Sequence, residues 1–220
     1  MLKRITYLWR RGDLAVDEFR AHWRAPHGPI AAKYRGLVAY NQNDVMARPW
    51  AVEGACSAPD GVVELWFADE VPEPGVDHVV GPQLMQDEPN FMSGFTGYEL
   101  QSDSISDPTT WKIWVRGRWR NGVCDDAALE RLASRLGSAA GPRAIAQTNV
   151  VDPETELFTR DYLDVQSDPP RVLVIVDVGD NEPSPVVLDE IERIARGVDA
   201  PIVGTDGLVT REARVVSPEL

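Results

Sequence analysis

The segment FRAHWRAPHGPI, residues 19–30, decides the fold of this chain. Apolar and aromatic side chains recur through and around it at helical spacing, at Val16, Phe19, Trp23, Ile30 and Tyr34. Steps of three, four and seven residues place them on one face of a helix, which we predict over residues 15–34. His27 falls on the same face. Pro26 and Pro29 each lack a backbone N–H, so the helix should kink or loosen around His27.

A histidine on the buried face of a helix has two interpretations. Most inward histidines are core residues whose ring is hydrogen-bonded to a carbonyl or a carboxylate. A kinked helix with an inward histidine also makes a suitable pocket wall, because an imidazole titrates near neutral pH and can transfer protons. The surroundings of His27 distinguish the two: a cavity beside the ring favours function, and a filled core favours structure.

The segments around this helix predict two units with the same order of elements, β-α-β-β-α-β. In the first unit we expect strands at 2–10, 37–46, 62–68 and 95–104, the helix at 15–34 and a short helix between 73 and 92. In the second unit we expect strands at 111–120, 142–151, 171–178 and 207–216, with helices at 125–138 and 184–198. Residues 47–61 and 152–169 should be loops, and 102–110 a linker. The predicted domains are therefore 1–105 and 106–220.

A short internal repeat supports this division. Residues 36–45, GLVAYNQNDV, align without a gap with residues 141–150, GPRAIAQTNV, and share Gly, Ala, Gln and Val. In the same register His27 corresponds to Leu132 and Asn41 to Ala146. We therefore infer a tandem duplication in which the second half keeps the scaffold, while the polar residues of a site remain only in the first half.

The order of elements also predicts how the two units assemble. A β-α-β-β-α-β unit forms a four-stranded antiparallel sheet with its helices on one face, which leaves the other face apolar and open. Two such units can cover these faces by pressing them together. Alternation along the strands puts Asn41 and Asn43 on one face of the first sheet and Tyr40 on the other. In the next strand Glu64 and Trp66 share a face.

Composition excludes several classes of protein. The chain has 220 residues with 43% hydrophobic side chains, and its formal net charge of -13 argues against nucleic-acid binding. We find no apolar run long enough to span a membrane and no signal-peptide pattern at the start, so no membrane partner is expected. Two cysteines, Cys56 and Cys124, make neither a disulfide framework nor a zinc site. We therefore expect the protein in a reducing compartment, the cytoplasm.

Four segments together resemble the EthD family. They are YLWRR at 7–11, FRAHWRAPH at 19–27, GLVAYNQN at 36–43 and GVVELWF at 61–67, and the resemblance covers roughly residues 1 to 100. That family belongs to the dimeric α/β-barrel superfamily of ferredoxin-like folds. The resemblance implies an α+β fold of two tandem ferredoxin-like units, packed face to face as a pseudo-dimeric α/β barrel. A usual family member is one unit that pairs with another, whereas here the pair looks fused, as a monomeric pseudo-dimer or a homodimer of such chains.

The resemblance also implies a kind of site. Members of the family and superfamily include dehydratase-like and decarboxylase-like enzymes of aromatic polyketide pathways, polyketide cyclases, lactone isomerases, cofactor-free quinone-forming monooxygenases and haem-degrading enzymes. They share a pocket between the sheet and its helices that holds a flat or cyclic small molecule. The recurring histidine of the family maps to His27, and its Glu-Leu-Trp-Phe strand maps to Glu64 and Trp66.

The leading functional hypothesis is a small-molecule enzyme that moves protons without a metal or other cofactor. It would be a lyase or dehydratase, a cyclase or an isomerase acting on a hydrophobic, oxygenated aromatic or polyketide-like compound. His27 would be the catalytic acid or base, and Glu64 would fix its tautomer or hold a substrate hydroxyl. The expected substrate-binding side chains are Tyr7, Trp23, Tyr40, Asn41, Asn43 and Trp66.

Three alternatives stay open at this point. Glu64 could form a structural ion pair with Arg4 or Arg24. The chain could be a cofactor-free or haem-type monooxygenase, or a non-catalytic accessory or binding protein. His22, His27 and His78 do not have the spacing of metal ligands, so no metal is expected.

Overall fold

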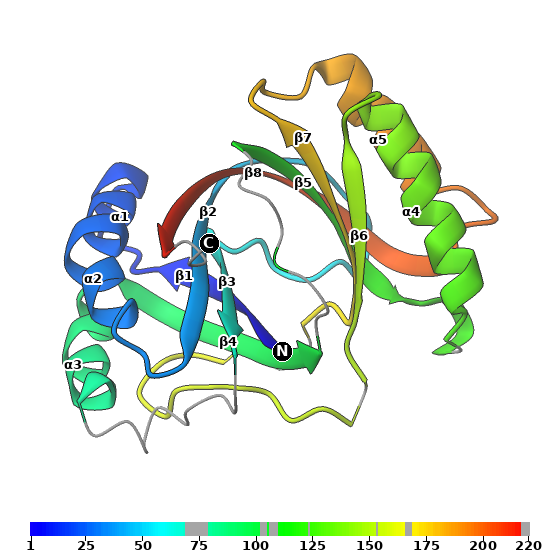
Figure 1. The fold of residues 1–220 in the computed structure, drawn as a ribbon. Helices are drawn as coiled ribbons and strands as arrows, with labels where there is room; N and C mark the ends of the chain where they lie inside the picture. The colour runs from blue at the N-terminus through cyan, green and yellow to red at the C-terminus, as the bar shows by residue number, and fades with distance from the viewer. Residues whose placement is uncertain are drawn as a thin grey trace.

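The computed structural model of the chain describes residues 1–68, 79–101, 105, 110–122, 124–152, 154–165 and 169–216. His78 and nearly all of the predicted linker at 102–110 lie outside the described residues. Within them, the elements follow the predicted β-α-β-β-α-β order twice, as the colour ramp of Figure 1 shows. The division into domains near residue 105 stays a proposal.

Eight antiparallel strands form one continuous curved sheet with the order β4-β1-β3-β2-β8-β5-β7-β6. The first half supplies β1 (Leu2–Arg10), β2 (Leu37–Ala51), β3 (Gly61–Phe67) and β4 (Met92–Gln101). The second half supplies β5 (Trp111–Trp119), β6 (Ile145–Val150), β7 (Val172–Gly179) and β8 (Ile202–Val216). Both halves have the same internal strand order, and they join where β2 pairs with β8.

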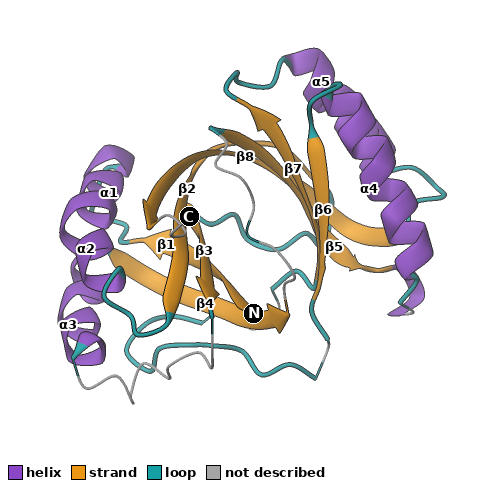
Figure 2. Ribbon diagram, in the orientation of Figure 1, coloured by secondary structure: helices purple, strands orange, loops and turns teal. Residues whose placement is uncertain are grey.

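The helices lie on the outside of this curved sheet (Figure 2). The first half carries α1 (Val16–His22), η1 (Trp23–His27), α2 (Gly28–Ala31), α3 (Val80–Asp87) and η2 (Glu88–Asn90). The second half carries η3 (Arg120–Gly122), α4 (Asp126–Ala140) and α5 (Pro185–Ala195). We call the helix side of the sheet its outer face and the opposite side its inner face. In the described part of the chain, every helix is too short or too polar to cross a membrane.

The predicted loosening around His27 is confirmed. The expected helix at 15–34 is divided into α1, the π-helical turn η1 and α2. Pro26 lies inside the π turn and has no N–H to donate, and the Gly28 N–H bonds instead to the Trp23 carbonyl five residues earlier. The turn keeps both Trp23 and His27 buried against the sheet.

The two inner faces pack against each other, as expected for a pseudo-dimeric barrel. Apolar residues from both halves form one buried cluster between them, which includes Ile5, Tyr7, Val62, Tyr98, Trp114, Leu173, Ile175 and Leu208. The outer faces hold separate clusters beneath their own helices. The predicted α+β barrel of two ferredoxin-like units is therefore the fold.

Strands β2 and β8 pair along the seam between the two halves, and both are longer than predicted. We expected a loop from residue 47, but β2 continues to Ala51, and β8 begins at Ile202 rather than 207. The extra residues of β2 pair with β8, where Trp50 lies opposite Gly207, whereas Ile202 and Val203 at the start of β8 pair with β5. The Trp50 ring fills the space above Gly207, and a Cβ atom added there would lie 2.3 Å from it.

Replacing Gly207 by alanine is expected to destabilise the protein by about 1–3 kcal/mol, because the new methyl group would overpack the Trp50 ring. Urea unfolding followed by tryptophan fluorescence measures the change. Gly12→Ala is the matched control, since a Cβ atom there would meet nothing within 4 Å. Equal stabilities of the two variants would contradict the packing of Trp50 on Gly207.

Among the described residues, strand pairing does not close the barrel, and β4 and β6 are the two edges of the sheet. A segment of the second half, residues 154–165, instead crosses to the β4 edge of the first half (yellow in Figure 1). We call this segment the strap. The Gly97 and Phe158 backbones exchange two hydrogen bonds of 2.8 Å, and the Asp164 carbonyl accepts a third from the Phe95 N–H. The strap thus fixes part of the second half beside the helices of the first.

Candidate functional site

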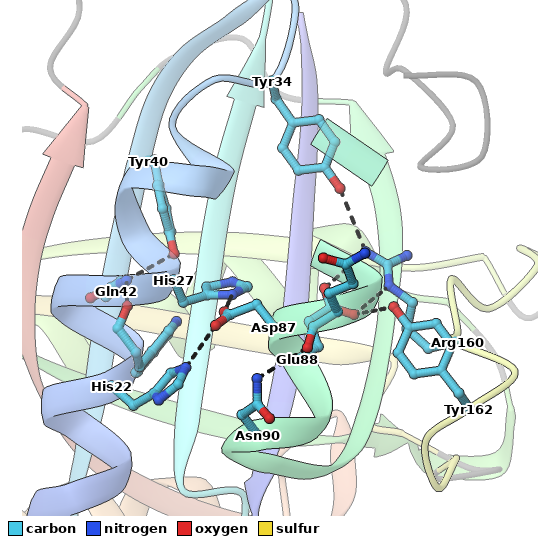
Figure 3. Close-up of polar contacts among 12 residues, drawn as sticks. His22, His27, Tyr34, Tyr40, Gln42, Asp87, Glu88, Asn90, Arg160 and Tyr162 are labelled. Atoms are coloured by element: carbon cyan, nitrogen blue, oxygen red, sulfur yellow. Dashed lines mark hydrogen bonds and ion pairs between the residues drawn. The ribbon is translucent and has the colours of Figure 1, made fainter. Parts of the chain in front are cut away.

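Two histidines and one aspartate meet between α1, η1 and α3 (Figure 3). His27 Nδ1 lies 2.9 Å from one oxygen of Asp87, and His22 Nε2 lies 2.8 Å from the other. Both rings also contact Phe91, with ring centroids 5.0 Å and 4.8 Å away. Asp87 is the last residue of α3. The end of α3 therefore holds the two imidazole rings that α1 and η1 supply.

The charge on Asp87 sets the tautomer of each ring. Burial acts to raise the pKa of Asp87, but the hydrogen bonds from His27 and His22 outweigh it and hold this pKa below its ordinary value. An ionised carboxylate only accepts hydrogen bonds, so each ring must donate from the nitrogen that faces it. A neutral His27 therefore carries its proton on Nδ1, which leaves Nε2 as a base.

His27 borders a narrow cavity between the outer face of the first half of the sheet, the helices of that half and the strap. Polar side chains in its lining come from all three, namely Arg4, Thr6, His27, Tyr34, Tyr40, Glu88 and Arg160. The cavity has about 400 Å³ of empty space, including a part that opens to solvent. Only about 30 Å³ of it can hold the centre of a water molecule, so a ring-sized ligand would press the lining apart.

Two tyrosine hydroxyls lie in this lining. Burial raises the pKa of Tyr34 and of Tyr40, so both remain protonated donors at neutral pH. The Tyr40 hydroxyl accepts a hydrogen bond of 2.9 Å from the Gln42 amide, which in turn donates to the Trp23 carbonyl of the π turn. The sheet thereby fixes the position of the Tyr40 hydroxyl relative to the turn that carries His27.

The strap completes the opposite end of the cavity. Arg160 donates two hydrogen bonds to Glu88, at 2.8 Å and 3.2 Å, and a longer one of 3.5 Å to the Tyr34 hydroxyl. Tyr162 donates to the same Glu88 carboxylate at 2.5 Å. Glu88 directly follows Asp87 in the chain, so the strap also restrains the residue next to the one that holds His27.

The structure divides the residues expected in the site between the two faces of the sheet. His27, Trp23 and Tyr40 lie on the outer face, and of these His27 and Tyr40 line the cavity. The others lie on the inner face, in the interior of the barrel: Tyr7, Asn41, Asn43, Glu64 and Trp66. Alternation along β2 and β3 is as predicted, and it is this alternation that keeps Asn41, Asn43 and Glu64 away from His27.

Glu64 belongs to a buried charge network. Its carboxylate lies 2.8 Å from the Lys3 ammonium and 2.7 Å from that of Lys112, and Asn43 donates to it at 3.2 Å. Burial alone would raise the pKa of Glu64, but Lys112 and Lys3 lower it to about 2. The suggested ion pairs of Glu64 with Arg4 or Arg24 are wrong, since Arg4 pairs with Glu99 and Arg24 with Asp44. A carboxylate held ionised on the far face of the sheet cannot orient His27.

The remaining inner-face residues have partners there too. The Tyr7 and Tyr98 hydroxyls are 3.0 Å apart, and Arg214 donates to Asn41 at 2.8 Å. The Lys3 ammonium lies 4.9 Å from the centre of the Trp66 ring. The contact of Arg214 with Asn41 connects the two halves of the barrel, whereas the other two lie within the first half. We leave Tyr7, Asn41 and Trp66 out of the proposed site.

Sequence reasoning missed His22, Asp87 and Arg160. His22 and His27 are five residues apart, which in a regular α-helix would point them about 140° away from each other. The π turn brings them to one carboxylate, and the spacing alone gives no sign of it. Arg160 lies in a segment predicted only as a loop. A basic residue amid aromatic ones, FTRDYL at 158–163, was the available signal.

The corresponding space in the second half is apolar. Leu132, which aligns with His27, belongs to the buried apolar cluster beneath α4 and α5. Among the described residues, no three His, Cys, Asp or Glu side chains are arranged to hold a metal ion. The polar cavity of the first half is therefore the candidate site.

The fold and the cavity define a class of protein, an α+β barrel with a polar pocket between a sheet and its helices. The family model of the EthD domain matches residues 11–94, so the first half of this chain carries an EthD domain. No curated protein sequence matches the chain significantly.

Solved structures share this fold at low sequence identity. Two mutant forms of chlorite dismutase from Candidatus Nitrospira defluvii superpose with TM-scores of 0.51 at 8% identity. The match covers 97% of this chain and 92% or 91% of theirs. An anthrone oxidase-like protein matches with a TM-score of 0.46 at 8% identity, over 100% of this chain and 96% of that one. At this identity the chlorite dismutase likeness concerns the fold alone.

Proposed function

We propose that this protein is a small-molecule enzyme that transfers protons within a flat or cyclic oxygenated compound, with His27 as acid and base. The observation that carries the proposal is the Asp87-held ring of His27 in the wall of a cavity. The EthD domain and its pocket between sheet and helices support a role with a small molecule. Dehydration, cyclisation and isomerisation of aromatic or polyketide-like compounds all fit this chemistry.

The reaction would begin at a C–H bond beside a carbonyl group. His27 Nε2 removes the proton, the C–H electron pair forms a C=C bond, and the carbonyl π electrons move to the oxygen to give an enolate. Asp87 stabilises the imidazolium that forms, while the Tyr34 or Tyr40 hydroxyl donates to the enolate oxygen. The carbonyl then re-forms in one of two ways. The imidazolium returns the proton to another carbon of the conjugated enolate, which isomerises the compound, or the enolate electrons break the C–O bond of a β-hydroxyl, which the imidazolium protonates so that it leaves as water.

The narrowness of the cavity favours one alternative, a binding or accessory protein without chemistry. His27 is only 6% exposed, and the free space beside it is small. In that case the contact between His27 and Asp87 would be a satisfied core hydrogen bond.

The described lining does not fit the macrocycle of a haem-type monooxygenase, so we derive no step through haem.

Deuterium exchange tests the proposal directly. The protein is incubated in D₂O with cyclic β-diketones, hydroxynaphthoquinones and their carboxylated derivatives, and NMR follows the loss of the acidic C–H signal. We expect the wild type to accelerate exchange for at least one compound, and His27→Ala to lose that acceleration. Arg193→Gln, on the exposed face of α5, is the control that keeps it.

Two results would contradict proton transfer by His27. Full acceleration by a folded His27→Ala protein would assign the base to another group. Binding of the compounds without any acceleration would favour the accessory role.

A further inference from the structure

Two arginines lie together at the strap end of the cavity. Arg4 from β1 is 2% exposed, and Arg160 from the strap is 7% exposed. Both stack on Phe158, with guanidinium carbons 3.7 Å and 4.7 Å from the ring centre. One cation comes from each half of the chain, and both line the cavity that His27 borders.

Arg4 is only partly compensated by its carboxylate partner. Arg4 contacts Glu99 at 2.5 Å through one nitrogen, and the Glu99 side chain is 38% exposed. Burial lowers the pKa of Arg4 in spite of this contact. The buried Nε of Arg4 has no hydrogen-bond partner among the described residues. A buried guanidinium N–H without an acceptor is costly, and an anionic acceptor would stabilise it.

Arg160 also keeps donor capacity. Its Nε and Nη2 donate to Glu88 and Tyr34, whereas Nη1 donates to none of the described residues. The Glu88 pair fixes the guanidinium plane, so the remaining N–H groups have a set direction. Arg4, Arg160 and Tyr34 all line this end of the cavity.

We propose that Arg4, Arg160 and Tyr34 bind a carboxylate group of the substrate, so that the compounds taken by this cavity are flat or cyclic carboxylic acids. The carboxylate would lie at the strap end, and the ring would extend along Phe158 toward His27. This assignment deepens the proposed function and rests on it for the placement of a reacting carbon near His27. It also explains why the strap of the second half crosses to the first, since Arg160 reaches the site only from there.

Binding of matched acids and amides tests the proposal. Benzoate, 1-naphthoate and 2-naphthoate are compared with benzamide and the two naphthamides by calorimetric titration of the full-length protein at neutral pH. Acid and amide have nearly the same shape and differ in charge. We expect at least one acid to bind ten times or more tightly than its amide, because charge-assisted hydrogen bonds are the stronger ones.

Two variants test whether the preference for the acid over the amide depends on Arg160 in the strap. Arg160→Gln alone would leave Glu88 buried without a cation, so we pair it with Glu88→Gln, which removes both charges together. This double variant is expected to lower the preference for the acid at least tenfold while amide binding changes little. Arg160→Lys keeps the charge but loses the fork of donors, and it should lower the preference severalfold. Arg193→Gln should leave it unchanged.

The outcomes separate this proposal from the proposed function. Equal binding of acids and amides, no binding of any pair, or a preference that survives in the folded double variant would overturn the carboxylate site. His27→Ala is expected to keep the preference, because His27 is not part of the anion site. A preference for acids in a protein that never accelerates exchange would leave the carboxylate site standing and overturn proton transfer.

Discussion

Replacing Asp87 by asparagine is expected to lower the rate of proton transfer about 10²–10⁴-fold, the range of a general acid–base contribution. The carboxylate now accepts from both His27 and His22. An asparagine amide accepts through its oxygen but donates through its nitrogen, so one ring would have to accept instead of donate. If that ring is His27, the proton moves to Nε2, and this nitrogen can no longer act as the base.

The same substitution removes the charge that stabilises the imidazolium formed during the reaction. Loss of the orienting carboxylate beside a catalytic histidine reduces the rate strongly in hydrolases that use such a pair. Deuterium exchange measures the rate here, and ¹⁵N chemical shifts of the two imidazole rings report their tautomers. A structural role alone would not change the tautomer in a protein that remains folded.

Two controls make the result specific. Asp180→Asn makes the same chemical change at an exposed position in the second half and should leave the rate unchanged. His22→Gln should lower the rate less than Asp87→Asn, because His22 does not line the cavity. A folded Asp87→Asn protein with full activity and an unchanged His27 tautomer would show that Asp87 does not position this ring.

Replacing Lys112 by methionine is expected to destabilise the protein by about 3–5 kcal/mol, the usual cost of breaking a buried ion pair. Lys112 is fully buried on the inner face, where its ammonium lies 2.7 Å from Glu64 and 2.5 Å from Glu212. Removal of the cation leaves Glu64 with Lys3 alone and Glu212 with the more distant Arg214 at 3.6 Å. Thermal unfolding should shift down by roughly 6–20 °C for a chain of this size.

A charge-balanced variant separates charge from packing. Lys112→Met combined with Glu212→Gln removes one charge of each sign and should recover part of the lost stability, because Glu212 is then no longer a buried charge without its cation. The exposed Arg193–Glu190 pair on α5 provides the contrast, and Arg193→Gln there should not change the melting temperature measurably. Equal melting temperatures of Lys112→Met and the wild type would mean that the network does not stabilise the barrel.

Lowering the pH should weaken the buried charge network of Glu64, Lys3 and Lys112. Since the pKa of Glu64 is lowered to about 2 from an ordinary value near 4.3, its ionised form stabilises the folded state fully above about pH 4.3. This contribution is lost as the pH falls toward about 2. The stability difference between the wild type and Glu64→Gln should therefore shrink across this range in urea unfolding curves.

Local sequence patterns determined the helices and strands, the inner and outer faces of the strands, and the EthD domain in the first half. The helical stripe from Phe19 to Tyr34 and the alternation along 62–67 depend on spacing within a short segment, so they can be read without knowing the rest of the fold. The motifs around His27 and Glu64 identified the EthD domain in the same way, and Pro26 correctly indicated the break in the helix. The inner and outer faces of β2 and β3 were also correctly separated.

Only the tertiary structure decided which faces meet and which side chains share a site. Trp50 lies in a strand because β8 offers it a partner more than 150 residues later, at Gly207. Asp87 meets His27 because a π turn and the end of α3 happen to converge, and Arg160 enters the cavity because the strap crosses from the other half. Pairings over such distances depend on the packing of whole elements, and no spacing within one segment encodes them.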